Sequence, residues 1–293
     1  MSNVISRLLV FFIGIPIVMG IIYLPYFNHV AFHIMLLLIT AGAASELHHM
    51  LSLKHKVHSK KLVVTLSTLI SLVAALHSVL PRKYNPFQIM GSEVITYFYI
   101  ITLLIILAKE AITAQTFEDS NTKIATSVFT ITYTGFLITF IQRMIAWKLD
   151  GKTIIVPMFI TFVLMVFMCD SIAWFMGVLF GKNNKGFVKA SPNKSLMGFF
   201  GGFIGAIAAG IGAYYFWSEI FKGPVYKIII ISVCMAFSSI IGDLAESVFK
   251  RSSGVKDSGK VIPGRGGVLD SVDSILMSAP IFYLLVSILY GPF

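Results

Sequence analysis

Long stretches without a single charge restrict this chain to a membrane fold. The 20 residues from Leu8 to Phe27 contain no Asp, Glu, Lys or Arg, and that is the length a helix needs to cross about 30 Å of hydrocarbon. The whole chain of 293 residues is 57% hydrophobic and 12% charged, with a mean hydropathy of +0.86, whereas soluble proteins have about 25% charged residues. The sequence therefore predicts a polytopic membrane protein and argues against two soluble domains.

The apolar runs and the residues that interrupt them predict an all-α fold with about nine transmembrane helices. Membrane-spanning β-strands would need only about 9–11 alternating residues, and these runs are far longer. The expected helices are Leu8–Phe27, Val30–Met50, Leu62–Leu80, Val94–Ala114, Ile124–Trp147, Ile154–Phe180, Leu196–Trp217, Val225–Phe249 and Ile275–Tyr290. The fourth is interrupted by Lys109 and Glu110.

The basic residues of the loops predict an orientation. With the N-terminus, including Arg7, in the cytoplasm, 16 of the 23 Lys and Arg residues fall on the cytoplasmic side, as the positive-inside rule requires. An odd number of spans then places Phe293 on the other side. The net charge of +10 follows from this asymmetry and from attraction to anionic lipids, so it does not imply a nucleic-acid partner.

Four polar residues share one face of the eighth expected helix. Asp243, Glu246, Ser247 and Lys250 lie at i, i+3, i+4 and i+7. Carboxylates near a membrane normally face the interior of a helix bundle or a water-filled cavity. Glu246 and Lys250 could form a simple ion pair, whereas Asp243 has no basic residue within one turn on its N-terminal side.

The segment that follows has the composition of a phosphate site. Its five cations are Lys250, Arg251, Lys256, Lys260 and Arg265, and its glycines are Gly254, Gly259, Gly264, Gly266 and Gly267. Glycines allow a backbone to approach a ligand closely with its amides turned inward. A solvated positive-inside loop is the alternative.

Two further carboxylates, Asp270 and Asp273, begin the ninth expected helix. They could simply cap the N-terminus of that helix, where acidic side chains are stabilising. Together with Asp243 they could instead hold Mg²⁺, which binds one or two carboxylates and the phosphates of a substrate.

The stretch SVFKRSSGVKDSGKVIPGRGGVLDSVD, residues 247–273, resembles the signature of phosphatidate cytidylyltransferases, also called CDP-diacylglycerol synthases. Ten positions match: Ser247, Lys250, Arg251, Lys256, Asp257, Pro263, Gly266, Gly267, Asp270 and Asp273. Arg265 stands where the family has histidine, and Ser271 stands where it has arginine. Three upstream segments are also similar to the family: DSIAWFMGVLFGK from Asp170, SPNKS from Ser191 and GDLAES from Gly242.

The resemblance implies a Mg²⁺-dependent nucleotidyltransferase that converts CTP and phosphatidate (phosphatidic acid) into CDP-diacylglycerol and pyrophosphate for phospholipid biosynthesis. The catalytic residues it implies are Asp243, Ser247, Lys250, Arg251, Lys256 and Asp270. The substrate-binding residues it implies are Ser191, Lys194, Lys250, Arg251, Lys256 and Arg265. The metal ligands it implies are Asp243, Asp270 and Asp273.

The same resemblance divides the chain into N-terminal transmembrane helices, residues 1–150, and a catalytic region, residues 151–293. It also suggests a homodimer, multi-pass in the inner (cytoplasmic) membrane, with the active site facing the cytoplasm. Asp170, within the sixth expected helix, belongs to this site or is hydrogen-bonded to a neighbouring helix.

Two other functions stay open. An ion-coupled transporter would use Asp170, Asp243 and Glu246 as a relay, but its polar residues would be dispersed near mid-bilayer. A CTP-dependent enzyme acting on another membrane lipid would share most of the site. Glu46, His48 and His49 fit polar residues at the membrane interface better than a zinc site. His55 and His58 belong to a basic loop and fit a lipid-facing surface.

Overall fold

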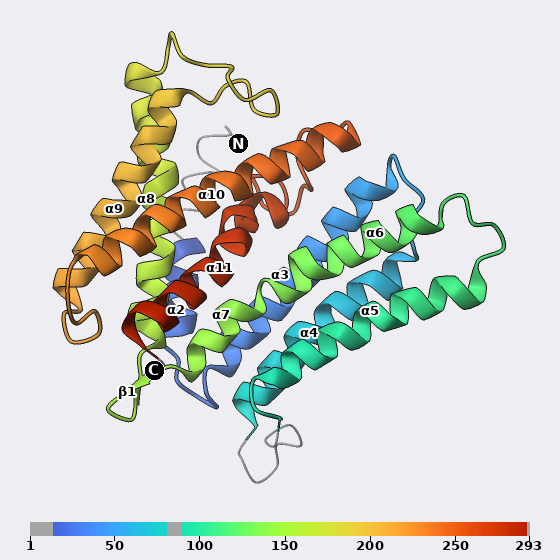
Figure 1. Ribbon diagram of the computed structural model, residues 1–293, viewed down its shortest axis with the longest axis horizontal. Helices are drawn as coiled ribbons and strands as arrows, with labels where there is room; N and C mark the ends of the chain where they lie inside the picture. The colour runs from blue at the N-terminus through green and yellow to red at the C-terminus, as the bar shows by residue number, and fades with distance from the viewer. Residues whose placement is uncertain (1–13, 81–89, 292–293) are drawn as a thin grey trace. The chain divides into compact units, whose positions relative to one another are not determined.

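The computed structural model describes residues 14–80 and 90–291 and consists almost entirely of helices (Figure 1). This confirms the predicted all-α class. The α-helices are α2 (Ile15–Ile22), α3 (Val30–Ser52), α4 (Lys60–Val79), α5 (Glu93–Thr113), α6 (Ser120–Thr130), α7 (Thr139–Arg143), α8 (Ile155–Phe180), α9 (Leu196–Phe216), α10 (Tyr226–Ser253) and α11 (Leu269–Tyr290). A π-helical segment, η4 (Ile131–Phe136), follows α6, a 3-10 turn, η5 (Met144–Ala146), follows α7, and the strands β1 (Lys148–Leu149) and β2 (Lys152–Thr153) form a hairpin.

Eight helical segments within residues 14–80 and 90–291 are long and apolar enough to cross a membrane. They match eight of the nine predicted spans, and the fifth of these spans is the continuous run from α6 through η4 and α7, residues 120–146. Of the predicted first span, Leu8–Phe27, the structure describes residues 14–27, and the helix α2 ends at Ile22, five residues before the expected end. The start of that span, together with Arg7 and Phe293, lies outside the described residues.

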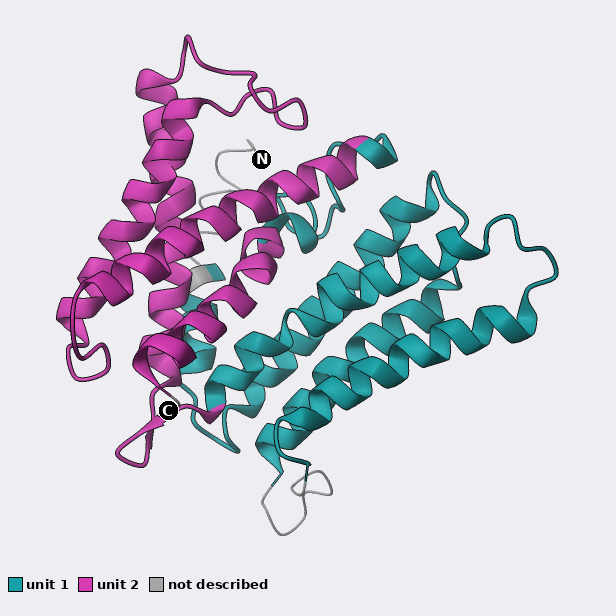
Figure 2. Ribbon diagram, viewed as in Figure 1, with its two compact units in different colours: residues 1–145, 252–271 teal, residues 146–251, 272–293 magenta. Residues whose placement is uncertain are grey.

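The helices form two compact units (Figure 2). Unit 1 contains residues 1–145 and 252–271, and unit 2 contains residues 146–251 and 272–293. The signature therefore passes from unit 2 to unit 1 at the end of α10 and back again in α11. This division groups residues by their contacts, so the predicted catalytic region at 151–293 stays a prediction.

The core of unit 1 is built around α4. Its buried residues Val63, Ile70 and Val73 pack in one cluster with apolar side chains of α5 and η4. Gly135 of η4 allows close approach to α4, because a Cβ there would lie 2.7 Å from the carbonyl oxygen of Ser67. Small residues at such contacts favour helix association in lipid.

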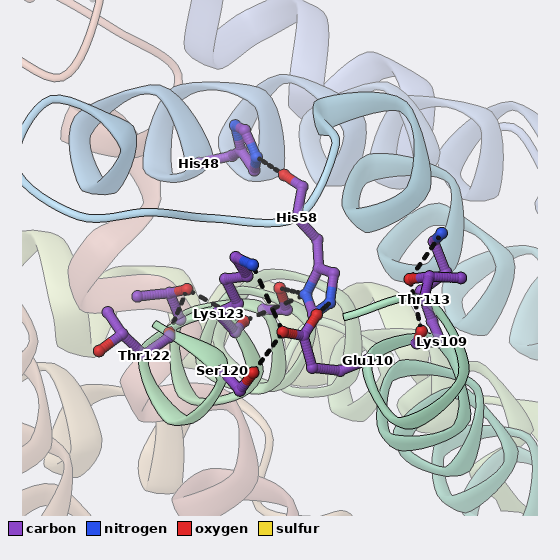
Figure 3. A network of polar contacts seen from close by, with 10 residues as sticks. His48, His58, Lys109, Glu110, Thr113, Ser120, Thr122 and Lys123 are labelled. Carbon is purple, nitrogen blue, oxygen red and sulfur yellow. Dashed lines mark hydrogen bonds and ion pairs between the residues drawn. The ribbon is translucent and has the colours of Figure 1, made fainter. Parts of the chain in front are cut away.

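A buried polar network ties the loop between α3 and α4 to α5 and α6 (Figure 3). His58 is 7% exposed, with Nδ1 2.8 Å from Ser127 Oγ and Nε2 3.0 Å from Glu110 Oε2. Glu110 also accepts hydrogen bonds from Ser120 Oγ at 2.6 Å and Lys123 Nζ at 3.4 Å. The interpretation of His58 as lipid-facing is therefore wrong. Its ring is one of several partners that compensate a buried carboxylate.

Unit 2 contains a tightly packed pair of helices, α8 and α9. A Cβ at Gly201 would lie 2.7 Å from the carbonyl oxygen of Ile172, and one at Gly205 would collide with the carbonyl of Met168. Glycine therefore lets the two backbones approach closely. This packing fixes α8, which carries Asp170, against α9, which follows the loop containing Lys194.

Candidate active site

The loop of the signature, residues 254–268, folds around two carboxylates of unit 1. The first is Asp270, whose Oδ2 atom accepts hydrogen bonds from the backbone of Gly267 at 2.7 Å and of Ser258 at 2.9 Å. The Ser258 hydroxyl also lies 2.9 Å from this oxygen. Asp270 thus closes the loop onto the first turn of α11, where negative charge is favoured. Its role as a metal ligand stays a prediction.

The second carboxylate is Glu46 of α3, whose contact with the signature loop the sequence analysis missed. Its Oε1 atom accepts a hydrogen bond from the backbone of Val268 at 3.0 Å, and Oε2 accepts one from Leu269 at 2.8 Å. Ser258 Oγ donates to Oε2 at 3.1 Å. Glu46 is 8% exposed, so the protein buries it, and its position at the membrane interface stays a prediction. Its position in an otherwise apolar span was the available signal.

The glycines of the loop make room for these two carboxylates. A Cβ at Gly259 or at Gly267 would collide with a carboxylate oxygen of Glu46. Gly266 has φ +108°, and a Cβ there would collide with Asp270. The glycine-rich backbone was expected to turn its amides toward a ligand. Amides at four positions are instead hydrogen-bonded to protein carboxylates: 258, 267, 268 and 269.

The cations of the loop lie on its outer surface. Lys256, Lys260 and Arg265 are all exposed, whereas Ser258 and Gly267 are buried. The loop therefore has an anionic interior, held by backbone amides, and a cationic exterior. An anionic ligand would meet the side chains of this exterior.

In unit 2, Lys194 and Asp243 form an ion pair. Lys194 lies near the end of the loop between α8 and α9. It is part of a tight turn in which its backbone N–H donates a hydrogen bond to the Ser191 carbonyl at 3.1 Å. Asp243 lies on α10 with 39% of its side chain exposed. The structure thus brings together two residues of separate predicted motifs, and it supplies the basic partner that Asp243 lacks on its own helix.

Two more carboxylates lie near this pair within unit 2. Asp273 of α11 is 8% exposed and interacts electrostatically with Asp243, Asp170 and Lys250. Gly242 allows this arrangement, because a Cβ there would lie 2.8 Å from the Asp273 carbonyl oxygen. Asp170 is exposed on α8 and accepts a hydrogen bond from a serine of α10 at 3.4 Å. Negative charge therefore accumulates where α8, α10 and α11 meet.

The ion pair between Glu246 and Lys250, which the sequence left open as an alternative, is present. Lys250 Nζ lies 2.6 Å from Glu246 Oε2, and the glutamate side chain is 2% exposed. The neighbouring Ser247 is half-buried, and Arg251 is exposed at the last turn of α10. Lys250 therefore neutralises a buried carboxylate at the start of the signature.

The predicted metal ligands are divided between the units: Asp243 and Asp273 belong to unit 2, and Asp270 belongs to unit 1. Within residues 14–80 and 90–291, no group of three or more His, Cys, Asp or Glu side chains is arranged to hold a metal ion. The assignment of these three residues to a metal stays a prediction.

Comparison with known proteins agrees with the resemblance of the signature. The sequence model of the cytidylyltransferase family matches residues 5–289. A phosphatidate cytidylyltransferase of Haemophilus influenzae is 43% identical over 121 residues, covering 41% of this chain and 42% of that protein. One of Thermotoga maritima is 38% identical over 130 residues, covering 42% and 46%. One of Staphylococcus aureus is 29% identical over 225 residues, covering 76% and 80%. The first two matches thus span less than half the length of those relatives.

Proposed function

We propose that this chain, which belongs to the cytidylyltransferase family, is a phosphatidate cytidylyltransferase that forms CDP-diacylglycerol and pyrophosphate from CTP and phosphatidate. The match of the family model over residues 5–289 carries this proposal. The signature at 247–273 and the phosphatidate cytidylyltransferases among the relatives support the choice of substrates.

In the proposed reaction a phosphate oxygen of phosphatidate attacks the α-phosphorus of CTP. The bond from that phosphorus to the bridging oxygen breaks, and pyrophosphate leaves. Such chemistry depends on positioning and charge neutralisation more than on a protein nucleophile. The chain offers cations for this purpose, and Ser191 and Ser247 would orient phosphate oxygens. The proposed phosphate-binding cations are Lys194, Lys250, Arg251, Lys256 and Arg265.

We propose that Mg²⁺ is the cofactor and that Asp243, Asp273 and Asp270 hold it. Carboxylate oxygens are the hard donors that Mg²⁺ prefers. Asp243 supports this choice, because its carboxylate already binds a cation, the ammonium group of Lys194. When bound, the metal would neutralise the charge of the phosphates. The side chain of Lys194 would contact a phosphate.

We also propose that the N-terminus and the active site face the cytoplasm and that the protein acts as a homodimer in the cytoplasmic membrane. The 16 of 23 basic residues on that side support the orientation. A reporter fused after the C-terminus should be active outside the cytoplasm, and a cytoplasmic signal would contradict the nine-span topology. Crosslinking in native membranes should trap a species of twice the monomer mass; monomer alone would contradict the dimer.

The reaction can be tested with purified protein in detergent. Labelled CTP, phosphatidate and Mg²⁺ should give a lipid-soluble cytidine product, and EDTA should abolish it because the phosphates lose their metal. The product would be measured by organic extraction. Boiled protein provides the control for transfer of label without catalysis.

Two outcomes would point elsewhere. Product from another phospholipid or a polyprenyl phosphate, but not from phosphatidate, would indicate a different lipid substrate. No product from any lipid, with the protein shown to be folded, would contradict the enzyme proposal and favour the alternative of an ion-coupled transporter.

A further inference from the structure

Helix α3 contacts the loop of the signature at two positions one turn apart. Glu46 accepts hydrogen bonds from the backbone of Val268 and Leu269, although 223 residues separate Glu46 from Leu269 in the sequence. One turn earlier, a Cβ at Gly42 would lie 3.0 Å from a methyl group of Val268. Positions i and i+4 share a helix face. The same face of α3 therefore makes both contacts with the loop.

The chemistry of Glu46 suits an anchor better than a ligand-binding group. Both of its carboxylate oxygens already accept hydrogen bonds from the loop, and the residue is 8% exposed. Hydrogen bonds from amides to a carboxylate are roughly twice as strong as neutral ones. Leu269 is the first residue of α11, so the negative charge also lies at a helix N-terminus, where the dipole favours it.

We propose that Glu46 is a positioning residue that fixes the signature loop and thereby the phosphate-binding cations that the loop carries. Ser258 and Val268 are bound to Glu46 on the inner side of the loop, and Lys256 and Arg265 are exposed on its outer side. A loop held in one conformation presents its cations before a substrate arrives, which reduces the entropy lost on binding. The anchor itself needs no substrate, whereas its effect on turnover rests on the proposed function.

The anchor predicts a change in loop mobility. A spin label at Val261→Cys, where the native side chain is 70% exposed, reports on the loop; a label at Phe117→Cys, native exposure 77%, reports on another loop of unit 1. Both labels require replacing the two native cysteines by alanine. Glu46→Ala should sharpen the spectrum at 261 and leave that at 117 unchanged, since only the first loop loses its anchor.

Matched variants make this test specific. Glu46→Gln should give an intermediate spectrum at 261, because one oxygen acceptor remains. His49→Ala, at an exposed position of the same helix, should change neither label. An unchanged spectrum at 261 in Glu46→Ala would overturn the proposal.

A second measurement keeps Glu46 in place and disturbs the same contact from the loop. Gly259→Ala forces a Cβ onto Glu46 and should lower kcat/KM for CTP about tenfold or more. The loss should be clearly smaller in a Glu46→Ala background, because the collision with Glu46 is then gone and only a contact of 3.1 Å with the Gly267 Cα remains. Gly212→Ala, where a Cβ meets open space, is the control. Equal losses from Gly259→Ala in both backgrounds would contradict a shared contact.

The two measurements separate this inference from the proposed function. The spectra decide whether Glu46 holds the loop, even if the wild-type protein does not turn over CTP. An inactive wild type with a label mobilised by Glu46→Ala would count against the proposed reaction alone and would support the anchor. An active wild type with an immobile label in Glu46→Ala would overturn the anchor alone.

Discussion

Replacing Asp243 by asparagine is expected to lower cytidylyltransferase turnover by about 10²–10³-fold, the range seen when one preorganised electrostatic group is removed. Asp243 is more accessible than the buried Asp273, and it already binds a cation, Lys194. An amide cannot replace a carboxylate as a hard anionic ligand. The loss should appear as lower turnover and a higher Mg²⁺ concentration at half-maximal rate.

The fold should tolerate this change. The Asp243 side chain is 39% exposed, and its charge repels that of buried Asp273. Its removal should therefore leave the thermal unfolding midpoint in detergent unchanged or raise it. Asp150→Asn is a suitable control, since Asp150 is exposed in the β1–β2 turn with φ 50°, which asparagine tolerates. Normal turnover in Asp243→Asn would exclude Asp243 from the site.

Replacing Lys250 by methionine is expected to affect both stability and turnover. The Glu246 side chain is 2% exposed and lies 2.6 Å from the Lys250 ammonium. Breaking a buried ion pair by removing one partner costs about 3–5 kcal/mol, so the unfolding midpoint should fall clearly. Turnover should fall by about 10²-fold or more, because the proposed phosphate-binding cation is lost as well.

A double variant separates the two roles. Lys250→Met with Glu246→Gln removes the buried charge along with its partner, so stability should return toward the wild-type value. Turnover should stay low if Lys250 binds phosphate. Recovery of turnover together with stability would mean that Lys250 acts only by neutralising Glu246. The measurements are thermal unfolding in detergent and the extraction assay on the same preparations.

The membrane fold follows from the sequence for a simple physical reason. Lipid requires long apolar segments with internally satisfied backbone hydrogen bonds, and this requirement is local in the chain. Eight expected spans accordingly reappear as helices, including α5, which continues through Lys109 and Glu110. The pair formed by Glu246 and Lys250 could be recognised as a possibility for the same reason, because the spacing i, i+4 alone brings the two side chains together.

The candidate site residues could be named from their motifs, but their ion-pair and hydrogen-bond partners could not. Lys194 and Asp243 come from different motifs, and no periodicity relates them. His58 was expected on the surface because it lies in a basic segment, yet Glu110 draws it into the interior. In each case a charged side chain is paired with a residue from a distant segment, because an unpaired charge away from water costs free energy.

The sequence by itself determined the class of fold, the family signature and eight of the nine expected spans, all except the first. These depend on composition, run length and residue order. Only the tertiary structure showed which groups the glycines of the signature leave room for. They admit the carboxylates of Glu46 and Asp270. Packing of α3 against the loop brings Glu46 across 223 residues to the N-terminus of α11, and such a contact follows from how helices assemble, which no local pattern encodes.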